Sequence, residues 1–363
     1  MKRIIKQTNN LISFIDVKRC RWKQIFSKNI LFPIIWVTRR CNLRCRMCQQ
    51  WQTSSEILHE ELTTKEWYSF IDAAYKLKAA VIIITGGEPL LRSDIFDIIR
   101  YIRIYGISVH LCTNGTLINE DIIKGLRFSG VNSISVSIDS YLSDIHNQMR
   151  GVECYDKVME GIKLMKKSLP GIKIGINTLI TKRNFRNIYK MVAFAEELKV
   201  DQIKFSPIHT NLKHKNNNQD CFKELIFKDE DLFELSYEVK KLIKAISLSR
   251  LLSNSLEFLN GLSFLYNSDY QRVPCFAGYI SCSVDSLGWV SPCEDIEGNE
   301  NLRDKSLENI LKSKAFNELR KKVHQCTSKC WDTTHTEINI RCSTQGFIRQ
   351  FCQILKESFF YLR

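Results

Sequence analysis

Short apolar runs alternate with longer amphipathic stretches from about residue 31 to residue 250. The apolar runs are nearly continuous, which is typical of strands buried on both faces of a parallel sheet. They predict strands at Ile34–Thr38, Ala80–Thr85, Ser108–Thr113, Ser133–Ile138, Lys173–Leu179 and Gln202–Phe205. The amphipathic stretches predict helices near residues 64–78, 94–105, 118–128, 154–168, 184–198 and 229–249. Six strand–helix repeats in this order predict an α/β fold, a partial (β/α)6 barrel of the TIM type.

The pattern changes after the last of these strands. Asn211–Asp220 is a polar stretch that predicts a surface loop, and residues 250–270 predict a linker. Further on, Ser281–Asp285 and Trp289–Val290 predict a hairpin, and residues 306–323 predict a helix. These changes divide the chain into a basic N-terminal extension (1–30), the barrel (31–250), a small cysteine-rich domain (251–345) and an amphipathic C-terminal tail (346–363).

Composition limits the kind of protein further. The 363 residues are 44% hydrophobic, enough for a large core, and no run approaches the roughly 18 apolar residues of a membrane span. Fourteen cysteines without a secretory leader indicate metal chemistry in a reducing compartment, so we expect a cytoplasmic protein. The net charge of +14 permits an anionic partner, but no nucleic-acid motif accompanies it. A solvated basic surface is the simpler interpretation.

Three cysteines, Cys41, Cys45 and Cys48, lie on a short loop directly after the first predicted strand. Three thiolates can hold a four-iron cluster while leaving one iron without a protein ligand, and that iron can then bind another molecule. Zinc is the alternative, but a structural zinc site normally takes four protein ligands. The next candidate ligand, His59, lies eleven residues beyond Cys48, so the spacing favours an iron–sulfur cluster.

The second predicted strand ends in the turn Gly86-Gly87-Glu88-Pro89. Its glycines let the backbone approach a ligand closely, and its glutamate supplies an acceptor. A Cys-x3-Cys-x2-Cys loop followed one strand–helix unit later by this turn resembles the radical S-adenosylmethionine (SAM) superfamily. Met47 departs from the family pattern, in which an aromatic residue usually precedes the third cysteine.

The resemblance implies the same partial barrel, a [4Fe-4S] cluster on the three cysteines, and SAM bound to the open iron through its amino and carboxylate groups. In that family an electron from the cluster cleaves SAM to a 5′-deoxyadenosyl radical. The resemblance also implies that Gly86, Gly87 and Glu88 hold the SAM ammonium group. It assigns Ser137 and Arg150 to the ribose and the carboxylate.

Polar residues at the later strand ends leave alternatives open. Ser137 and Asp139 alternate onto one face of the fourth strand, and Ser137 is the one that we assign to the cofactor. Arg150 either pairs with a carboxylate through its guanidinium or caps the start of a helix at the surface. Asn177 either faces the cofactor or is a hydrogen-bonded core asparagine. Residues 112–115 fit a plain turn as well as a ligand role.

A second group of cysteines lies near the C-terminus, at Cys275, Cys293, Cys326 and Cys330. Four thiolates brought together by the hairpin and the helix would satisfy a four-iron cluster completely. This region resembles the auxiliary-cluster extension of radical SAM enzymes in its short form, the twitch domain, rather than the longer SPASM domain with seven motif cysteines. One auxiliary [4Fe-4S] cluster is therefore expected, with zinc as the alternative occupant and the ligand choice left open at two further cysteines, Cys282 and Cys342. The other cysteines are predicted to be small buried residues, at Cys20, Cys112, Cys154, Cys221 and Cys352.

The two ends of the chain carry less information. Residues 1–30 are basic with scattered apolar side chains and are predicted to pack on the barrel. Apolar residues in 346–363 recur at near-helical spacing, which predicts a helix that packs on its own protein or on a partner. The alternative is an interfacial helix that makes peripheral contact with a membrane.

The predicted function is that of a radical SAM enzyme, of oxidoreductase or transferase type, that takes hydrogen from a peptide or a small metabolite with help from the auxiliary cluster. A reductant such as flavodoxin or ferredoxin is the implied partner. Thirty residues before the barrel are too few for a leader-peptide-binding domain, which argues against leader-dependent peptides. The alternatives are an RNA-modifying radical SAM enzyme and a non-catalytic iron–sulfur or zinc protein, and the last would need neither the Gly-Gly-Glu-Pro turn nor a three-cysteine site.

Overall fold

A computed structural model describes residues 15–48, 50–53, 55–208, 223–262, 264–266 and 273–362. The predicted surface loop at Asn211–Asp220 and Cys221 lie outside this part of the chain. No helix in the described ranges combines the length and the apolar character that crossing a membrane requires.

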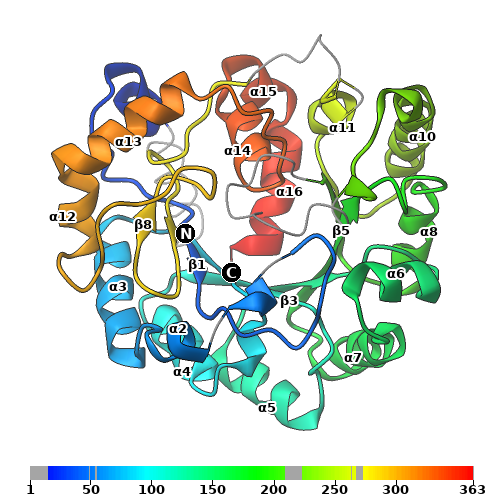
Figure 1. The fold of residues 1–363 in the computed structure, drawn as a ribbon, viewed down its shortest axis with the longest axis horizontal. Coiled ribbons are helices and arrows are strands. Elements are labelled where there is room, and N and C mark those ends of the chain that lie inside the picture. The colour runs from blue at the N-terminus through cyan, green and yellow to red at the C-terminus, as the bar shows by residue number, and fades with distance from the viewer. Residues whose placement is uncertain are drawn as a thin grey trace.

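The described strands form one eight-stranded sheet in the order β6-β5-β4-β3-β2-β1-β7-β8. The six parallel strands are β1 (Ile34–Trp36), β2 (Val81–Thr85), β3 (Ser108–Thr113), β4 (Ser133–Ser137), β5 (Lys173–Ile180) and β6 (Gln202–Pro207). The helices that follow them are α3 (Thr64–Lys76), α4 (Ile95–Ile104), α5 (Glu120–Ser129), α7 (Tyr155–Ser168), α8 (Lys190–Glu197) and α10 (Asp229–Leu248). Figure 1 shows these helices in a ring around the strands, so the predicted partial barrel is confirmed.

The sheet has an apolar outer face and a more polar inner face. In β4, Ile134 and Val136 belong to the core shared with the surrounding helices. Ser133, Ser135 and Ser137 alternate with them and therefore point the other way, into the barrel. The apolar runs drive the helices onto the outside of the sheet and leave polar side chains for the interior.

Several shorter elements connect these units or follow them. They are η1 (Gln50–Gln52), α2 (Ser55–His59), η2 (Pro89–Leu91) and α6 (Ser143–Arg150). The helix predicted at 306–323 is two helices, α12 (Leu307–Lys312) and α13 (Lys314–Gln325). The break is at Ser313, whose backbone is extended and whose hydroxyl accepts a hydrogen bond from the Phe316 N–H at 2.9 Å. A serine in that role caps the second helix.

The predicted hairpin is present and extends the barrel sheet. β7 (Ser283–Val284) and β8 (Val290–Ser291) pair antiparallel, as the turn residues predict. β7 also pairs parallel with β1, so the cysteine-rich region shares a hydrogen-bonded edge with the barrel.

The prediction of a linker at 250–270 is wrong for the described part of that segment. Helix α11 (Leu256–Leu262) lies there and buries Phe258, Leu259 and Leu262 in the main core. Leu252 also forms a bridge with Gln202 of β6. Interspersed serines and asparagines made the segment look polar, but its leucines and phenylalanine cover the barrel after β6.

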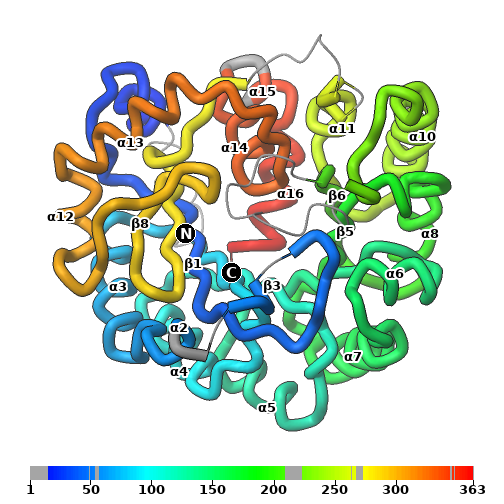
Figure 2. The backbone as a smooth tube through the Cα atoms, viewed as in Figure 1, coloured from blue at the N-terminus to red at the C-terminus, as the bar shows by residue number. Residues whose placement is uncertain are grey.

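The C-terminal tail is helical and packs on its own protein, as predicted. α14 (His335–Cys342) is followed by α15 (Thr344–Arg349) and α16 (Phe351–Tyr361). In Figures 1 and 2, α16 runs from the ring of helices towards its centre. There the rings of Tyr361 and His110 of β3 meet edge to face with centroids 4.9 Å apart. The prediction that Cys352 is buried is wrong, because this cysteine lies on the outward side of α16.

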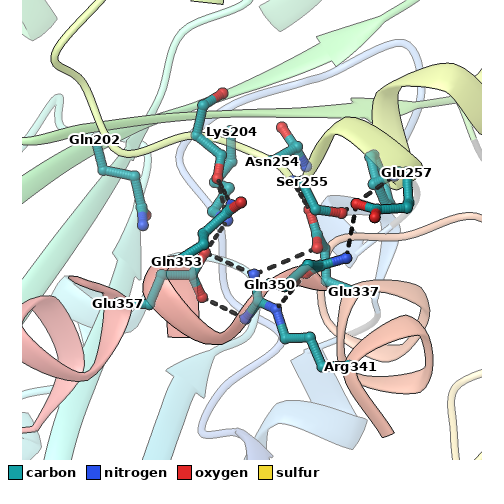
Figure 3. A network of polar contacts seen from close by, with 12 residues as sticks. Gln202, Lys204, Asn254, Ser255, Glu257, Glu337, Arg341, Gln350, Gln353 and Glu357 are labelled. Carbon is teal, nitrogen blue, oxygen red and sulfur yellow. Dashed lines mark hydrogen bonds and ion pairs between the residues drawn. The ribbon is translucent and has the colours of Figure 1, made fainter. Parts of the chain in front are cut away.

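A polar network fixes α16 to the barrel (Figure 3). The carboxylate of Glu357 accepts hydrogen bonds from Lys204 Nζ of β6 and from Arg341 Nη2 of α14, both at 2.7 Å. Arg341 also pairs with Glu337 at 3.3 Å, and Glu337 in turn accepts the backbone N–H of Ser255 at 2.8 Å. Side chains from α14 and α16 are thereby linked to β6 and to the start of α11.

Candidate active site

The three-cysteine loop lies over the carboxyl end of β1. Cys45 is buried, and Cys41 and Cys48 are half-buried. The loop is fixed by backbone hydrogen bonds from the N–H groups of Arg44 and Arg46 to the carbonyls of Arg150 and Met149 at the end of α6, at 3.1 and 3.0 Å. The loop thus lies where TIM-type barrels place their chemistry.

The three thiols share one small apolar cluster, in which they pack with Leu43 and Cys154. Burial raises the pKa of Cys41, and it raises the pKa of Cys45 to about 12. A thiolate there needs a cationic partner, which an iron ion supplies. No three His, Cys, Asp or Glu side chains of the described ranges converge closely enough to hold one metal ion. Three thiolates suit a multi-iron cluster, in which each thiolate binds a different iron, whereas a structural zinc ion would need a fourth ligand.

The Gly86-Gly87 turn packs directly against this loop. A Cβ atom on Gly87 would lie 2.1 Å from the carbonyl oxygen of Arg40, so only glycine fits. The N–H groups of Gly87 and Glu88 donate to the carbonyls of Thr38 and Arg40, both at 2.7 Å. The turn also explains why β1 ends at Trp36 and not at Thr38 as predicted. Because an ammonium group needs acceptors, the carbonyl oxygens of this turn are the part of its backbone suited to one.

Replacing Gly87 with alanine is expected to destabilise the protein by about 1–3 kcal/mol, as overpacking typically does, and to reduce iron binding by the three-cysteine loop. Thermal unfolding and iron content after anaerobic reconstitution would measure both effects. Gly171→Ala is the matched control, since a Cβ atom there meets nothing within 4 Å. Equal iron content in the two variants would contradict the expectation.

Glu88 is fully buried and joins the ends of β2 and β3. Its carboxylate accepts hydrogen bonds from Thr113 Oγ1 at 2.8 Å, from the Asn114 N–H at 2.7 Å and from the Leu90 N–H at 3.1 Å. Burial outweighs these hydrogen bonds and raises the pKa of Glu88 to about 7. Asn114 also donates to the Asn42 side chain of the cysteine loop at 2.9 Å. The turn at residues 112–115 therefore supports both Glu88 and the loop.

Arg150 lies at the end of α6 and points at the cysteine loop. Its Nη2 pairs with Asp139 at 2.8 Å, and its Nη1 lies 3.9 Å from the sulfur of Cys45. The interpretation of Arg150 as a surface residue at a helix start is wrong, because its side chain is only 12% exposed. Burial raises the pKa of Asp139, while the Asp139 carboxylate raises the pKa of Arg150 and keeps it charged. Asp139, set aside in favour of Ser137, is the residue that orients this arginine.

Ser137 and Asn177 lie side by side on the inner face of the barrel. They are paired residues of β4 and β5, and both are half-buried. Neither side chain makes a hydrogen bond with another of the described residues. The interpretation of Asn177 as a hydrogen-bonded core residue therefore has no support. Both polar groups lie on the face from which a ligand in the barrel would be reached.

Four cysteines line one cavity of about 50 Å³ beyond the hairpin, at Cys275, Cys293, Cys326 and Cys330. Burial raises the pKa values of Cys275, Cys293 and Cys330. Cys282 and Cys342 do not line this cavity and belong to two apolar clusters, so among the described cysteines the cavity is lined by the four predicted ligands. Four thiolates around one cavity can supply a ligand for each iron of a four-iron cluster.

The other cysteines in the described ranges are not predicted ligands. Cys20 and Cys154 are buried as predicted, and Cys112 is half-buried on β3.

Charged residues beside this cavity were missed by the sequence analysis. The thiol of Cys330 donates to Asp332 Oδ2 at 3.1 Å, and His335 Nδ1 lies 3.3 Å from the same oxygen. Burial acts to lower the pKa of His335, but the carboxylates of Asp332, Glu294 and Asp295 outweigh it and raise that pKa to about 9. The signal was a histidine five residues after Cys330, which only the fold of α14 brings back to the cysteines.

Comparison with known proteins agrees with this geometry. The sequence profile of the Radical SAM superfamily matches residues 35–195, and that of an iron-sulfur cluster-binding domain, SPASM, matches residues 275–332. The chain thus carries a radical SAM domain followed by an iron-sulfur cluster-binding domain, as the sequence analysis predicted.

Curated relatives match about half of this chain. The chain is 40% identical over 167 residues to an AdoMet-dependent heme synthase of Methanosarcina barkeri, which is 46% of this chain and 47% of that one. It is 33% identical over 182 residues to an Fe-coproporphyrin III synthase of the same organism, 50% of this chain and 45% of the other. The chain thus spans about half the length of the curated relatives it matches.

Among solved structures, the fold resembles that of Streptococcus suis SuiB bound to the precursor peptide SuiA. The TM-score is 0.64 at 19% sequence identity, and the similarity covers 82% of this chain and 67% of SuiB. At this level of identity the similarity concerns the fold alone.

Proposed function

We propose that this radical SAM enzyme cleaves SAM reductively and abstracts a hydrogen atom from a small metabolite or a peptide. The observation that carries the proposal is the position of the Cys41/Cys45/Cys48 loop at the carboxyl end of β1, directly against the glycine turn and Arg150. When bound, a [4Fe-4S] cluster with one open iron supplies the electron that converts SAM to a 5′-deoxyadenosyl radical.

Groups around the loop suit the parts of SAM. The carbonyl oxygens of Gly86 and Gly87 and the carboxylate of Glu88 are acceptors for the ammonium. Arg150 has a buried Nε that makes no hydrogen bond within the described part of the chain, so it can donate to the carboxylate while Nη2 stays paired with Asp139. Ser137 and Asn177 face the barrel interior and can meet the ribose.

The Cys275/Cys293/Cys326/Cys330 group would hold an auxiliary [4Fe-4S] cluster that accepts the electron left on the substrate or anchors the substrate. All four irons of such a cluster would have a thiolate, so an electron-transfer role needs no open position. Zinc in this site would provide no electron acceptor.

The names of relatives support a small metabolite as the substrate. The heme and Fe-coproporphyrin III synthases that match about half of the chain are named for tetrapyrroles. The SuiB structure, bound to a precursor peptide, supports a peptide only through its fold. The net charge of +14 permits an RNA substrate, but no nucleic-acid motif accompanies it. We therefore rank RNA below a small metabolite and a peptide.

Anaerobic reconstitution of the full chain with iron and sulfide tests the proposal. About eight irons per chain are expected, as two four-iron clusters require, together with 5′-deoxyadenosine release on addition of SAM and dithionite. The measurements are iron and zinc analysis and chromatography of the SAM products. A protein that takes up zinc alone and leaves SAM intact would refute it.

A further inference from the structure

Helix α14 presents one face to the four-cysteine cavity. His335, Thr336 and Asn339 lie on that face and line the cavity with the cysteines. The hydroxyl of Thr336 donates to the carbonyl of Cys330 at 3.2 Å, and Asn339 Oδ1 accepts the Phe276 N–H at 2.9 Å, next to Cys275. α14 is therefore fixed to the two cysteine-bearing segments that approach it.

On this face, His335 has a ring nitrogen that makes no hydrogen bond within the described ranges. It is 7% exposed, and its Nδ1 side is taken up by Asp332. Its Nε2 atom is buried and has no hydrogen-bond partner in the described ranges. An unpaired buried polar atom costs about 1–3 kcal/mol, so an atom of this kind in a thiol-lined cavity indicates a group that the cavity receives.

Asp332 fixes the direction of the ring. Besides the contact with Nδ1, its carboxylate accepts the backbone N–H groups of Thr334 and His335 at 2.7 and 2.6 Å and the thiol of Cys330 at 3.1 Å. With Nδ1 held in this way, Nε2 is the ring nitrogen left for a group in the cavity that His335 lines. The surrounding carboxylates of Asp332, Glu294 and Asp295 favour a cationic ring, which donates from both nitrogens.

We propose that His335 Nε2 donates a hydrogen bond to a sulfur of the auxiliary cluster and thereby raises the reduction potential of that cluster. The inference rests on the auxiliary cluster of the proposed function. Four cysteines already supply a ligand for each of four irons, so the ring has no iron left to bind. Reduction adds negative charge to the cluster, and a nearby donor and cation stabilise the reduced form more than the oxidised one.

Redox titration of the reconstituted full chain, followed by electron paramagnetic resonance, tests this role. His335→Ala should retain about eight irons per chain, and its auxiliary signal should shift to a lower reduction potential. His335→Gln should recover part of the shift, because its amide N–H can donate. His324→Ala is the matched control, since His324 contacts Tyr279 and does not line the cavity, and it should leave the potential unchanged.

Each outcome decides the inference. An unchanged potential in His335→Ala with both clusters loaded would overturn it, as would a shift of the same size in His324→Ala. Loss of the second cluster in both His335 variants would also overturn it and make the histidine an iron ligand. A wild-type protein that forms one cluster only would count against the auxiliary site itself, which is a failure of the proposed function and is visible before any variant is made.

Discussion

Cys45→Ala is expected to abolish SAM cleavage and to remove about four of about eight irons per chain. Cys45 is the buried member of the three-cysteine loop, and its sulfur lies 3.9 Å from Arg150 Nη1. Two thiolates would then remain for a cluster that needs three. Changes to outer groups around a metal site already cost about 10–100-fold in binding or activity, so loss of a ligand should reduce 5′-deoxyadenosine formation by more than about 100-fold. Iron analysis and product chromatography would measure both effects.

Cys154→Ala is the matched control for this variant. Cys154 is buried in the same apolar cluster as Cys45 but is not a predicted ligand. It should keep the full iron content and the full rate of SAM cleavage. If the two variants lost the same amount of iron, the loss would reflect packing of the cluster and the assignment of Cys45 as a ligand would be wrong.

Glu357→Ala is expected to destabilise the protein by about 3–5 kcal/mol, the cost of leaving buried charges without their partner. Glu357 and Lys204 side chains are each 7% exposed, and Arg341 is 12% exposed. Removal of the carboxylate leaves two cations beside each other at the inner end of α16. Chemical denaturation at neutral pH would measure the change. Glu318→Ala is the control, since Glu318 is 62% exposed and pairs with Lys321 at the surface, and a change of no more than about 1 kcal/mol is expected.

The carboxylate of Glu357 also makes the stability of the protein depend on pH. Burial opposes its ionisation, but Arg341 and Lys204 outweigh burial and lower the pKa of Glu357 to about 2. The unfolded value is about 4.3, so the stabilisation is complete above that pH and is lost as the pH falls towards 2. The difference in stability between wild type and Glu357→Gln should therefore shrink below pH about 4. A difference that stays constant down to pH about 2 would contradict this assignment.

The strands and their order of appearance were predictable because each is a short apolar run between turn residues. β3 has the predicted bounds, and β2, β4, β5 and β6 differ from prediction by no more than two residues at either end. β1 is shorter at its carboxyl end, since the carbonyl of Thr38 turns to accept the Gly87 N–H. A contact between residues nearly fifty positions apart is invisible to any local pattern.

The elements that were mispredicted depend on contacts of longer range. α11 looked like a linker because the serines and asparagines in and around it obscure the apolar face that packs against α10 and α14. The tail was correctly predicted as helical and self-packing, but nothing in its sequence says that Glu357 meets a lysine 153 residues earlier. Buried charges of this kind are recognisable only when both partners are placed.

The candidate site, too, was predicted from the sequence only in part. Cysteine spacing and the glycine turn predict chemistry from neighbouring residues, and the structure packs Gly87 against Arg39 and Arg40, just before Cys41. Arg150 was identified, but its partner Asp139 was passed over because the alternation in β4 gives no reason to prefer it to Ser137. His335 was missed because α14 has to fold back before this residue reaches the cysteines. Asp332 was missed although it lies only two residues after Cys330.

Because β7 pairs with β1, the hairpin occupies the edge of β1 that β2 leaves open. β1 is hydrogen-bonded to β2 on one side and to β7 on the other, and Arg39, just after β1, pairs with Asp285 of the hairpin at 3.0 Å. A barrel cut off near residue 250 would expose the open edge of β1, and unpaired edges of this kind promote aggregation. The strand that leads into the first cysteine loop is thus completed by the segment that carries the second group. We therefore expect the barrel, when expressed without the hairpin, to aggregate more readily than the whole chain.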